Sequence, residues 1–155
     1  MTTDKLLATW FGAGLLPKAP GTWGSLAALP LGWAIQYFTG WAGLAVAALV
    51  VFLVGIWAAD AYAKRGADPD PGEIVIDEVA GQWLALLPAM GSPVFYLAGF
   101  LLFRLFDIWK PWPIRTVERR LKGGLSVMAD DILAGLIAAA LLCGFRYVWG
   151  DFDVR

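Results

Sequence analysis

The sequence contains no histidine and only one cysteine, Cys143, among its 155 residues. Without histidine, the chain cannot carry out Ser-His-Asp or Cys-His hydrolysis, form a phosphohistidine intermediate or bind a metal through imidazole ligands. A lone cysteine forms no disulfide within one chain, and Cys143 lies in an apolar run with no base nearby. Any chemistry must therefore come from carboxylates, hydroxyls and cations.

Charged residues are also scarce, since they make up 16% of the chain against 59% hydrophobic residues. Residues 19–59 and 79–103 contain no charge at all over 41 and 25 positions. Each run is long enough to cross a bilayer, which takes about 20 apolar residues in a helix. We therefore expect an integral membrane protein in contact with the lipid bilayer. The net charge of −1 shows no basic surplus, so we expect no nucleic-acid partner.

The length fits a single domain, residues 1–155, and the apolar segments predict an all-α fold. We expect a compact helical membrane protein with about four to five helices, including a helical hairpin broken by Pro and Gly. The predicted segments are a short amphipathic helix at 5–11 and further helices at 26–38, 42–63, 78–87, 94–109 and 130–149.

The predicted hairpin is centred on Pro88 and the PAMGSP segment, which divide one apolar run into two pieces too short to cross comfortably. We expect these pieces to enter the membrane and return to the same side. The segments 1–25, 60–77 and 104–129 then share one side and hold ten of the twelve Lys and Arg residues. The positive-inside rule makes that side cytoplasmic.

The segment GAGLLPKAPGTWGS, residues 12–25, is predicted to be an ordered loop because prolines interrupt it, with Ser25 as the N-cap of the next helix. Its glycines allow close backbone approach, and Thr22 and Ser25 offer hydroxyls. This composition suits anion binding at a helix N-terminus, although the same residues also make an ordinary turn at a membrane surface.

Among the thirteen Asp and Glu residues, three acidic signals lie at predicted helix ends beside the cytoplasmic segments. They are Asp77 with Glu78, Asp107, and Asp130 with Asp131. Converging carboxylates without histidine make a hard oxygen site that suits Mg²⁺ or Mn²⁺. The alternative is that each acid only caps a helix, but three signals at one predicted level favour a metal site.

Arg104, Asp107 and Lys110 follow at spacings of three and tend to share one helix face. They suit either a ladder of ion pairs or a carboxylate on a metal flanked by two cations that hold a phosphate. The basic residues between Arg115 and Lys122 fit a surface that faces lipid headgroups. Together these groups suit metal-assisted phosphoryl transfer or hydrolysis. The competing hypothesis is a small transporter or ion-conducting protein, which predicts carboxylates near the middle of its spans.

Four stretches resemble the phosphatidylglycerophosphatase A family: GAGLLPKAPGTWGSLAALPL, IVIDEVAG, FRLFDIWKPWPI and GGLSVMADDILAG. The resemblance implies an all-helical, Mg²⁺-dependent phosphoric monoester hydrolase that converts phosphatidylglycerophosphate into phosphatidylglycerol. It also implies a multi-pass protein of the bacterial inner membrane, with its active site on the cytoplasmic side.

Carried over to this sequence, the resemblance implies two sets of site residues. The metal ligands would be Asp77, Glu78, Asp107, Asp130 and Asp131, all but Asp130 also being catalytic, and the phosphate contacts Thr22, Ser25, Arg104 and Lys110. We favour hydrolysis by a metal-activated water with Asp131 or Asp77 as general base. A covalent aspartyl-phosphate is the second possibility.

Overall fold

A computed structural model describes residues 1–66 and 71–149, and within these ranges it contains helices and no strand. The α-helices are α1 (Thr3–Ala8), α2 (Pro20–Ala63), α3 (Ile76–Ala85), α4 (Pro93–Trp109), α5 (Ile114–Arg120) and α6 (Gly123–Trp149). Two short 3-10 helices, η1 (Ala13–Leu15) and η2 (Leu87–Ala89), complete the set. The all-α prediction is confirmed. Part of the predicted polar loop after α2, residues 67–70, lies outside the described residues.

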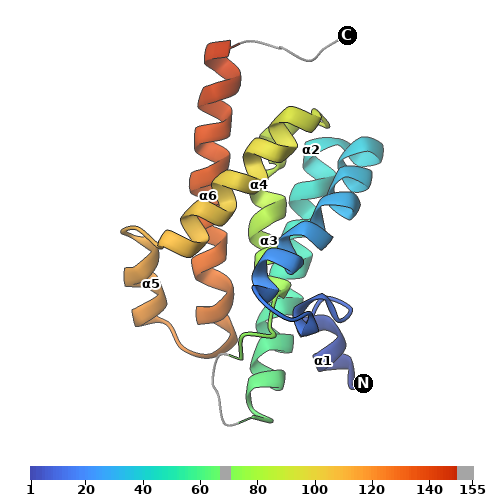
Figure 1. The fold of residues 1–155 in the computed structure, drawn as a ribbon, viewed down its shortest axis with the longest axis vertical. Coiled ribbons are helices and arrows are strands. Elements are labelled where there is room, and N and C mark those ends of the chain that lie inside the picture. The colour runs from blue at the N-terminus through green and yellow to red at the C-terminus, as the bar shows by residue number, and fades with distance from the viewer. Residues whose placement is uncertain (67–70, 150–155) are drawn as a thin grey trace.

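Helix α2 is two helices joined at Gly40, where the backbone leaves the helical region with φ 72° and ψ −172°. The halves, 20–39 and 41–63, run away from the N-terminal end of the molecule and back again (Figure 1). Glycine is required at this bend because other residues rarely adopt a positive φ. The predicted turn between the helices expected at 26–38 and 42–63 is thus confirmed.

The first half of α2 begins at Pro20, six residues before the predicted start, and its N-cap is Ala19 rather than Ser25. Proline interrupts a helix interior but suits the first helical position, where its fixed φ is helical and its missing N–H is not needed. Ser25 is therefore a buried residue inside the helix, and its hydroxyl donates to the Gly21 carbonyl oxygen over 2.9 Å. The predicted helix at 5–11 is likewise shorter, because α1 ends at Ala8 before the positive φ of Trp10 and Phe11.

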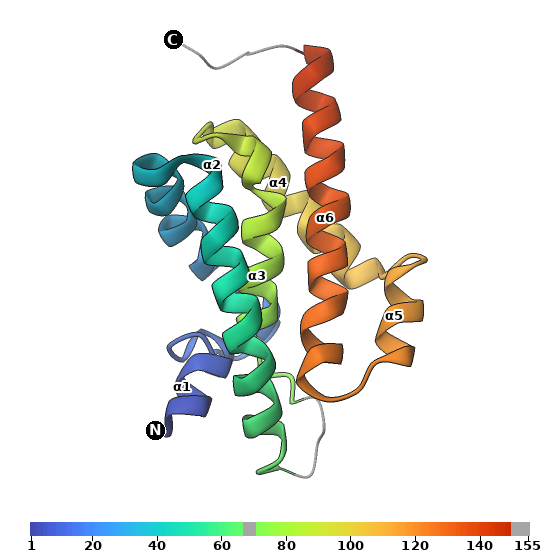
Figure 2. The ribbon, with the colours of Figure 1, turned by 180° about the vertical axis from the view of Figure 1, so that it is seen from behind.

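Helices α3 and α4 form the predicted broken hairpin, with η2 at its tip (Figures 1 and 2). Carbonyls freed at such a break need partners in an apolar surrounding. Gln36 Nε2 donates to the carbonyl oxygens of Leu86 and Leu87 over 3.2 and 3.1 Å. Arg146 of α6 donates to the Pro88 carbonyl oxygen over 2.8 Å. Side chains from two other helices therefore stabilise the tip.

Helix α6 begins at Gly123, seven residues before the predicted start at Asp130. The Asp60 carboxylate of α2 accepts a 2.8 Å hydrogen bond from the Gly124 amide and so supplies a cap from another helix. Asp130 and Asp131 consequently lie two turns inside α6, and the prediction that they begin a helix is wrong.

Helix α3 is the centre of the molecule, and most of its residues are buried against α2, α4 and α6. Large apolar side chains instead cover the outside, among them Phe38 (80% exposed), Ile108 (71%) and Leu53 (58%). Helices α2 and α6 are long and apolar enough to cross a membrane. An apolar exterior around these helices is typical of a protein whose surface is solvated by lipid.

Candidate active site

The site is built where α3 and α6 touch through two glycines, Gly81 and Gly135. A β-carbon on Gly81 would lie 2.5 Å from the Asp131 carbonyl oxygen, and one on Gly135 would collide with the Gly81 carbonyl oxygen. Only glycine allows backbones to approach this closely. Asp77 and Asp131 each precede one of these glycines by four residues, one helical turn, and therefore meet across the contact.

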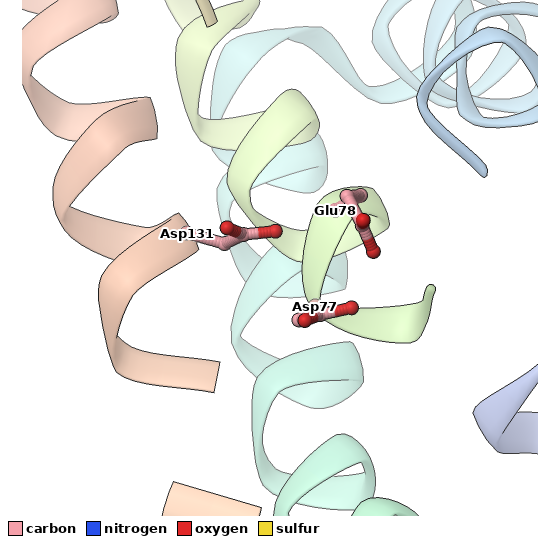
Figure 3. Close-up of side chains that lie close together, drawn as sticks. All are labelled: Asp77, Glu78 and Asp131. Carbon is pink, nitrogen blue, oxygen red and sulfur yellow. The ribbon is translucent and has the colours of Figure 1, made fainter. Parts of the chain in front are cut away.

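Three carboxylates converge here: Asp77 and Glu78 from the first turn of α3, and Asp131 from α6 (Figure 3). One oxygen from each lies within 4.8 Å of the others. Asp77 and Asp131 are buried, and Glu78 is 13% exposed at its side chain. Asp77 Oδ1 and Glu78 Oε2 have no hydrogen-bond partner in the described part of the chain. Such a group of buried oxygens could hold a metal ion.

Arg104 of α4 is the cation beside this acid group. Its guanidinium forms an ion pair with Asp107, one turn later on the same helix, and lies 4.0 Å from Glu78 Oε1. All three side chains are less than 15% exposed. The structure therefore contains one of the ion pairs that the spacing predicts, the pair between Arg104 and Asp107. Asp107 is not one of the three converging carboxylates, and it contacts the acid group through Arg104.

Lys110 belongs to a second charged group and does not continue the Arg104–Asp107 pair. It ends α4 with a left-handed backbone, φ 46°, and its ammonium lies 2.6 Å from both Asp130 Oδ2 and Glu118 Oε1. Burial disfavours the charged ammonium, but the hydrogen bonds to the two carboxylates outweigh this and raise the pKa of Lys110. Asp130 thus bonds to a cation, whereas its neighbour Asp131 joins the acid group.

The start of α2 lies against the acid group through Gly21. A β-carbon there would collide with the Glu78 carboxylate and lie 3.2 Å from an Arg104 guanidinium nitrogen. A helix N-terminus favours a nearby carboxylate. Of the two predicted hydroxyls on this turn, Ser25 bonds within its own helix, while Thr22 is half-buried with no hydrogen-bond partner for its hydroxyl in the described ranges.

The chain is similar to known proteins of one family. The family model described as phosphatidylglycerophosphatase A matches residues 6–146. The chain belongs to the phosphatidylglycerophosphatase A family. The family resemblance of the four sequence stretches is thereby confirmed.

Three relatives show how closely the chain follows others with this sequence pattern. Phosphatidylglycerophosphatase A of Escherichia coli is 40% identical over 93% of this chain and 84% of its own length. Its namesake from Haemophilus influenzae is 39% identical over 92% and 88%. A Bacteroides thetaiotaomicron protein named "Putative phosphatidylinositol-3-phosphatase" is 40% identical over 94% of each chain. No solved structure matches the chain.

Three residues that shape this site, Glu118, Gly81 and Gly135, were not predicted from the sequence. Glu118 pairs with Lys110 because the short helix α5, where no helix was predicted, packs against α6. The sequence does contain a pattern that indicates the role of Gly81 and Gly135. Each closes a D-x-x-A-G pattern, Asp77 to Gly81 and Asp131 to Gly135, and a glycine one turn after an acid on two helices is typical of a close crossing.

Proposed function

We propose that this protein is a Mg²⁺-dependent phosphatidylglycerophosphatase, a phosphoric monoester hydrolase that releases the terminal phosphate of phosphatidylglycerophosphate. The observation that carries the proposal is the buried group of Asp77, Glu78 and Asp131 with Arg104 beside it. The names of the Escherichia coli and Haemophilus influenzae relatives supply the substrate.

Magnesium fits the acid group by the chemistry of its donors. All three side chains offer oxygen, the ligand that Mg²⁺ prefers, and histidine is absent from the whole sequence. Two of the buried oxygens lack any other partner in the described part of the chain, and a cation would satisfy them. Bound there, Mg²⁺ would polarise the phosphoryl oxygens and lower the pKa of a water ligand.

The roles of the chain's own residues follow from their positions. Arg104 lies next to Glu78 and is placed to bind the phosphoryl oxygens, a role that guanidinium geometry favours. Lys110, held by Asp130 and Glu118, and the Thr22 hydroxyl flank the same region. Ser25 supports this turn because its hydroxyl donates a hydrogen bond to the Gly21 carbonyl oxygen, so we assign it a positioning role.

Hydrolysis needs a base and a way to balance charge as the ester bond breaks. Water attacks phosphorus, its proton passes to a carboxylate, the bond between phosphorus and the glycerol oxygen breaks, and that oxygen takes up a proton. Asp131 or Asp77 is the proposed base, because both lie at the α3–α6 contact. Asp107 forms an ion pair with Arg104 and so holds it beside Glu78, and we therefore assign Asp107 to the same catalytic group.

The proposed setting is the bacterial inner membrane, with several passes and the site on the cytoplasmic side. In Figure 1, α1, α5, the end of α2 and the start of α6 lie toward the same end of the molecule. Ten of the twelve Lys and Arg residues belong to the segments at this end. The positive-inside rule then supports a cytoplasmic orientation.

The competing hypothesis of an ion-conducting protein predicts acids near the middle of the spans, whereas the sequence predicts them at helix ends. Asp130 and Asp131 lie inside α6, so their place along the helix does not separate the two functions. The family and the largely buried Arg104 beside the acid group favour the phosphatase.

The deciding experiment is phosphate release from phosphatidylglycerophosphate in detergent micelles by purified protein, with Mg²⁺ and with a chelator. We expect activity that requires Mg²⁺ and is lost in Asp77→Asn and Asp131→Asn. Glu73→Gln is the control, because Glu73 is an exposed carboxylate outside the site that accepts a hydrogen bond from Tyr62. Phosphate release that survives both chelation and the two substitutions would refute the metal site. Ion flux through liposomes without phosphate release would support the competing function.

A further inference from the structure

A basic cavity of about 380 Å³ lies beside the candidate active site, between the end of α4 and the start of α5. It is lined by Trp109, Lys110, Pro111, Trp112, Arg115, Thr116 and Arg119. Three of these seven residues are cations and none is an acid. A cavity with this lining favours an anionic group.

Arg115 and Arg119 are the cations in this cavity that are free to bind a ligand. They lie four residues apart on α5 and so share one helix face. Both are exposed, and neither has an ion-pair or hydrogen-bond partner at its guanidinium within residues 1–66 and 71–149. Lys110 differs, because two carboxylates already neutralise its charge. Two guanidinium groups on one face match the geometry of a phosphate.

The tryptophans indicate that this cavity lies at the membrane surface. Trp109 is 62% exposed and Trp112 is 81% exposed, next to the cations. Exposed tryptophans of membrane proteins gather at the level of lipid headgroups. The anion available at that level is the phosphate of a lipid.

Lys110 connects the cavity to the active site. Its side chain lines the cavity, and its ammonium lies 2.6 Å from Asp130, the residue before Asp131 of the acid group. A lipid whose terminal phosphate lies at the acid group would extend its remaining headgroup along this contact toward Arg115 and Arg119. In phosphatidylglycerophosphate a single glycerol joins the terminal phosphomonoester to the phosphodiester of the lipid.

We propose that Arg115 and Arg119 bind the phosphodiester of the substrate lipid and thereby select headgroups that carry a phosphomonoester beyond a phosphodiester. The inference rests on the proposed phosphatase function and names its substrate class. The headgroups in the relatives' names, phosphatidylglycerophosphate and phosphatidylinositol 3-phosphate, both belong to this class. Phosphatidic acid does not, since its only phosphate is a monoester.

The test compares phosphatidylglycerophosphate with phosphatidic acid of the same acyl chains in neutral detergent micelles. In Arg115→Ala/Arg119→Ala we expect KM for phosphatidylglycerophosphate to rise about tenfold, as for the loss of charge-assisted hydrogen bonds, with kcat unchanged. KM for phosphatidic acid, or its inhibition constant if it is not cleaved, should change less than about twofold. The double lysine variant should restore only part of the affinity, because it keeps the charge but lacks the paired N–H donors of a guanidinium.

Arg120→Ala is the matched control, because Arg120 is an exposed cation of the same helix that does not line the cavity. It should leave both KM values unchanged. Equal loss of affinity for both lipids in the double alanine variant would overturn the proposal and show that the arginines only attract anionic surfaces. Unchanged affinity for both lipids would overturn it as well.

A binding measurement separates failure of this proposal from failure of the proposed function. Phosphatidylglycerol has the phosphodiester but no monoester, and diacylglycerol has neither. We expect phosphatidylglycerol, and not diacylglycerol, to change the tryptophan fluorescence of the full chain in micelles, with about tenfold weaker binding in the double alanine variant. If the wild-type protein releases no phosphate but binds phosphatidylglycerol in this way, the proposed phosphatase function is refuted and the proposed phosphodiester site is supported. Equal binding by wild type and variant refutes the phosphodiester site alone.

Discussion

Asp130 and Asp131 are neighbours in sequence but belong to two charged groups of opposite character. Asp131 joins Asp77 and Glu78, where three carboxylates converge and the nearest cation, Arg104, is shared with Asp107. Asp130 shares Lys110 with Glu118, and both contacts are 2.6 Å long. The first group has buried acids without matching positive charge, and the second has direct hydrogen bonds to an ammonium. A surplus of buried negative charge indicates a place for a cation, whereas a paired group indicates positioning.

The strongest test of this difference is to neutralise each aspartate in turn. Asp131→Asn should reduce phosphate release on the order of 1,000-fold, because it removes a ligand and a proposed base at once. Asp130→Asn should cost about tenfold, since it only loosens Lys110. Initial rates at saturating Mg²⁺ measure both. Equal losses in the two variants would show that the two groups act as one.

The contact that assembles the acid group can be broken without changing any charge. Gly81→Ala places a methyl group 2.5 Å from the Asp131 carbonyl oxygen and should destabilise the fold by about 1–3 kcal/mol. Activity should fall as well, because the two helices must separate. Thermal unfolding in micelles and rate measurements report the two effects.

Gly144→Ala is the matched control for that substitution. Gly144 lies on α6 and has no atom within 4 Å of an added β-carbon. Alanine there should be neutral or stabilise the helix by about 0.5–1 kcal/mol. A comparable loss at both glycines would show that the close contact is not what matters.

Magnesium should distinguish the two groups through stability alone. Binding to the acid group should stabilise the wild-type protein by about 2.7 kcal/mol at a concentration 100 times the dissociation constant. The stabilisation should be absent in Asp131→Asn and present in Asp130→Asn. Unfolding curves with and without Mg²⁺ measure this, and an equal gain in both variants would place the cation elsewhere.

The smallest effect of a destabilising substitution on activity is expected far from both groups, at the hairpin tip. Gln36→Leu leaves the carbonyls of Leu86 and Leu87 without their donor and should cost about 1–2 kcal/mol of stability. The activity of the folded fraction should be unchanged. Tyr96→Phe removes one 2.9 Å hydrogen bond to Gln36 and should cost about 1 kcal/mol. A selective loss of activity in either variant would show that the tip communicates with the site.

The sequence predicted the helical architecture because charge-free runs and a proline break are local signals. Asp77, Glu78 and Asp131 were all predicted, since acids stand out in apolar surroundings. Which of Asp130 and Asp131 faces the other acids was not predictable, because neighbouring residues point about 100° apart on a helix and the true start of α6 was hidden.

The start of α6 cannot be predicted from the local sequence, because its cap is Asp60, which lies 64 positions before Gly124. Pairing of Glu118 with Lys110 depends in the same way on the path of α5. Both contacts join different helices, so they are set by tertiary packing and leave no local pattern. The early start of α2 at Pro20 is different, because the rule that proline suits a first helical turn was available in the sequence.

Because α3 and α6 touch through glycines, the distance between the Asp77 and Asp131 carboxylates depends on how the two main chains are placed. Asp77 and Asp131 each lie one turn from the point where the backbones touch. A thinner or thicker bilayer can change the tilt of a helix. If α6 tilts about the glycine contact, residues one turn away from that contact move less than residues at the helix ends. We therefore expect a change in bilayer thickness to alter the distance between these two carboxylates less than it alters the positions of the helix ends.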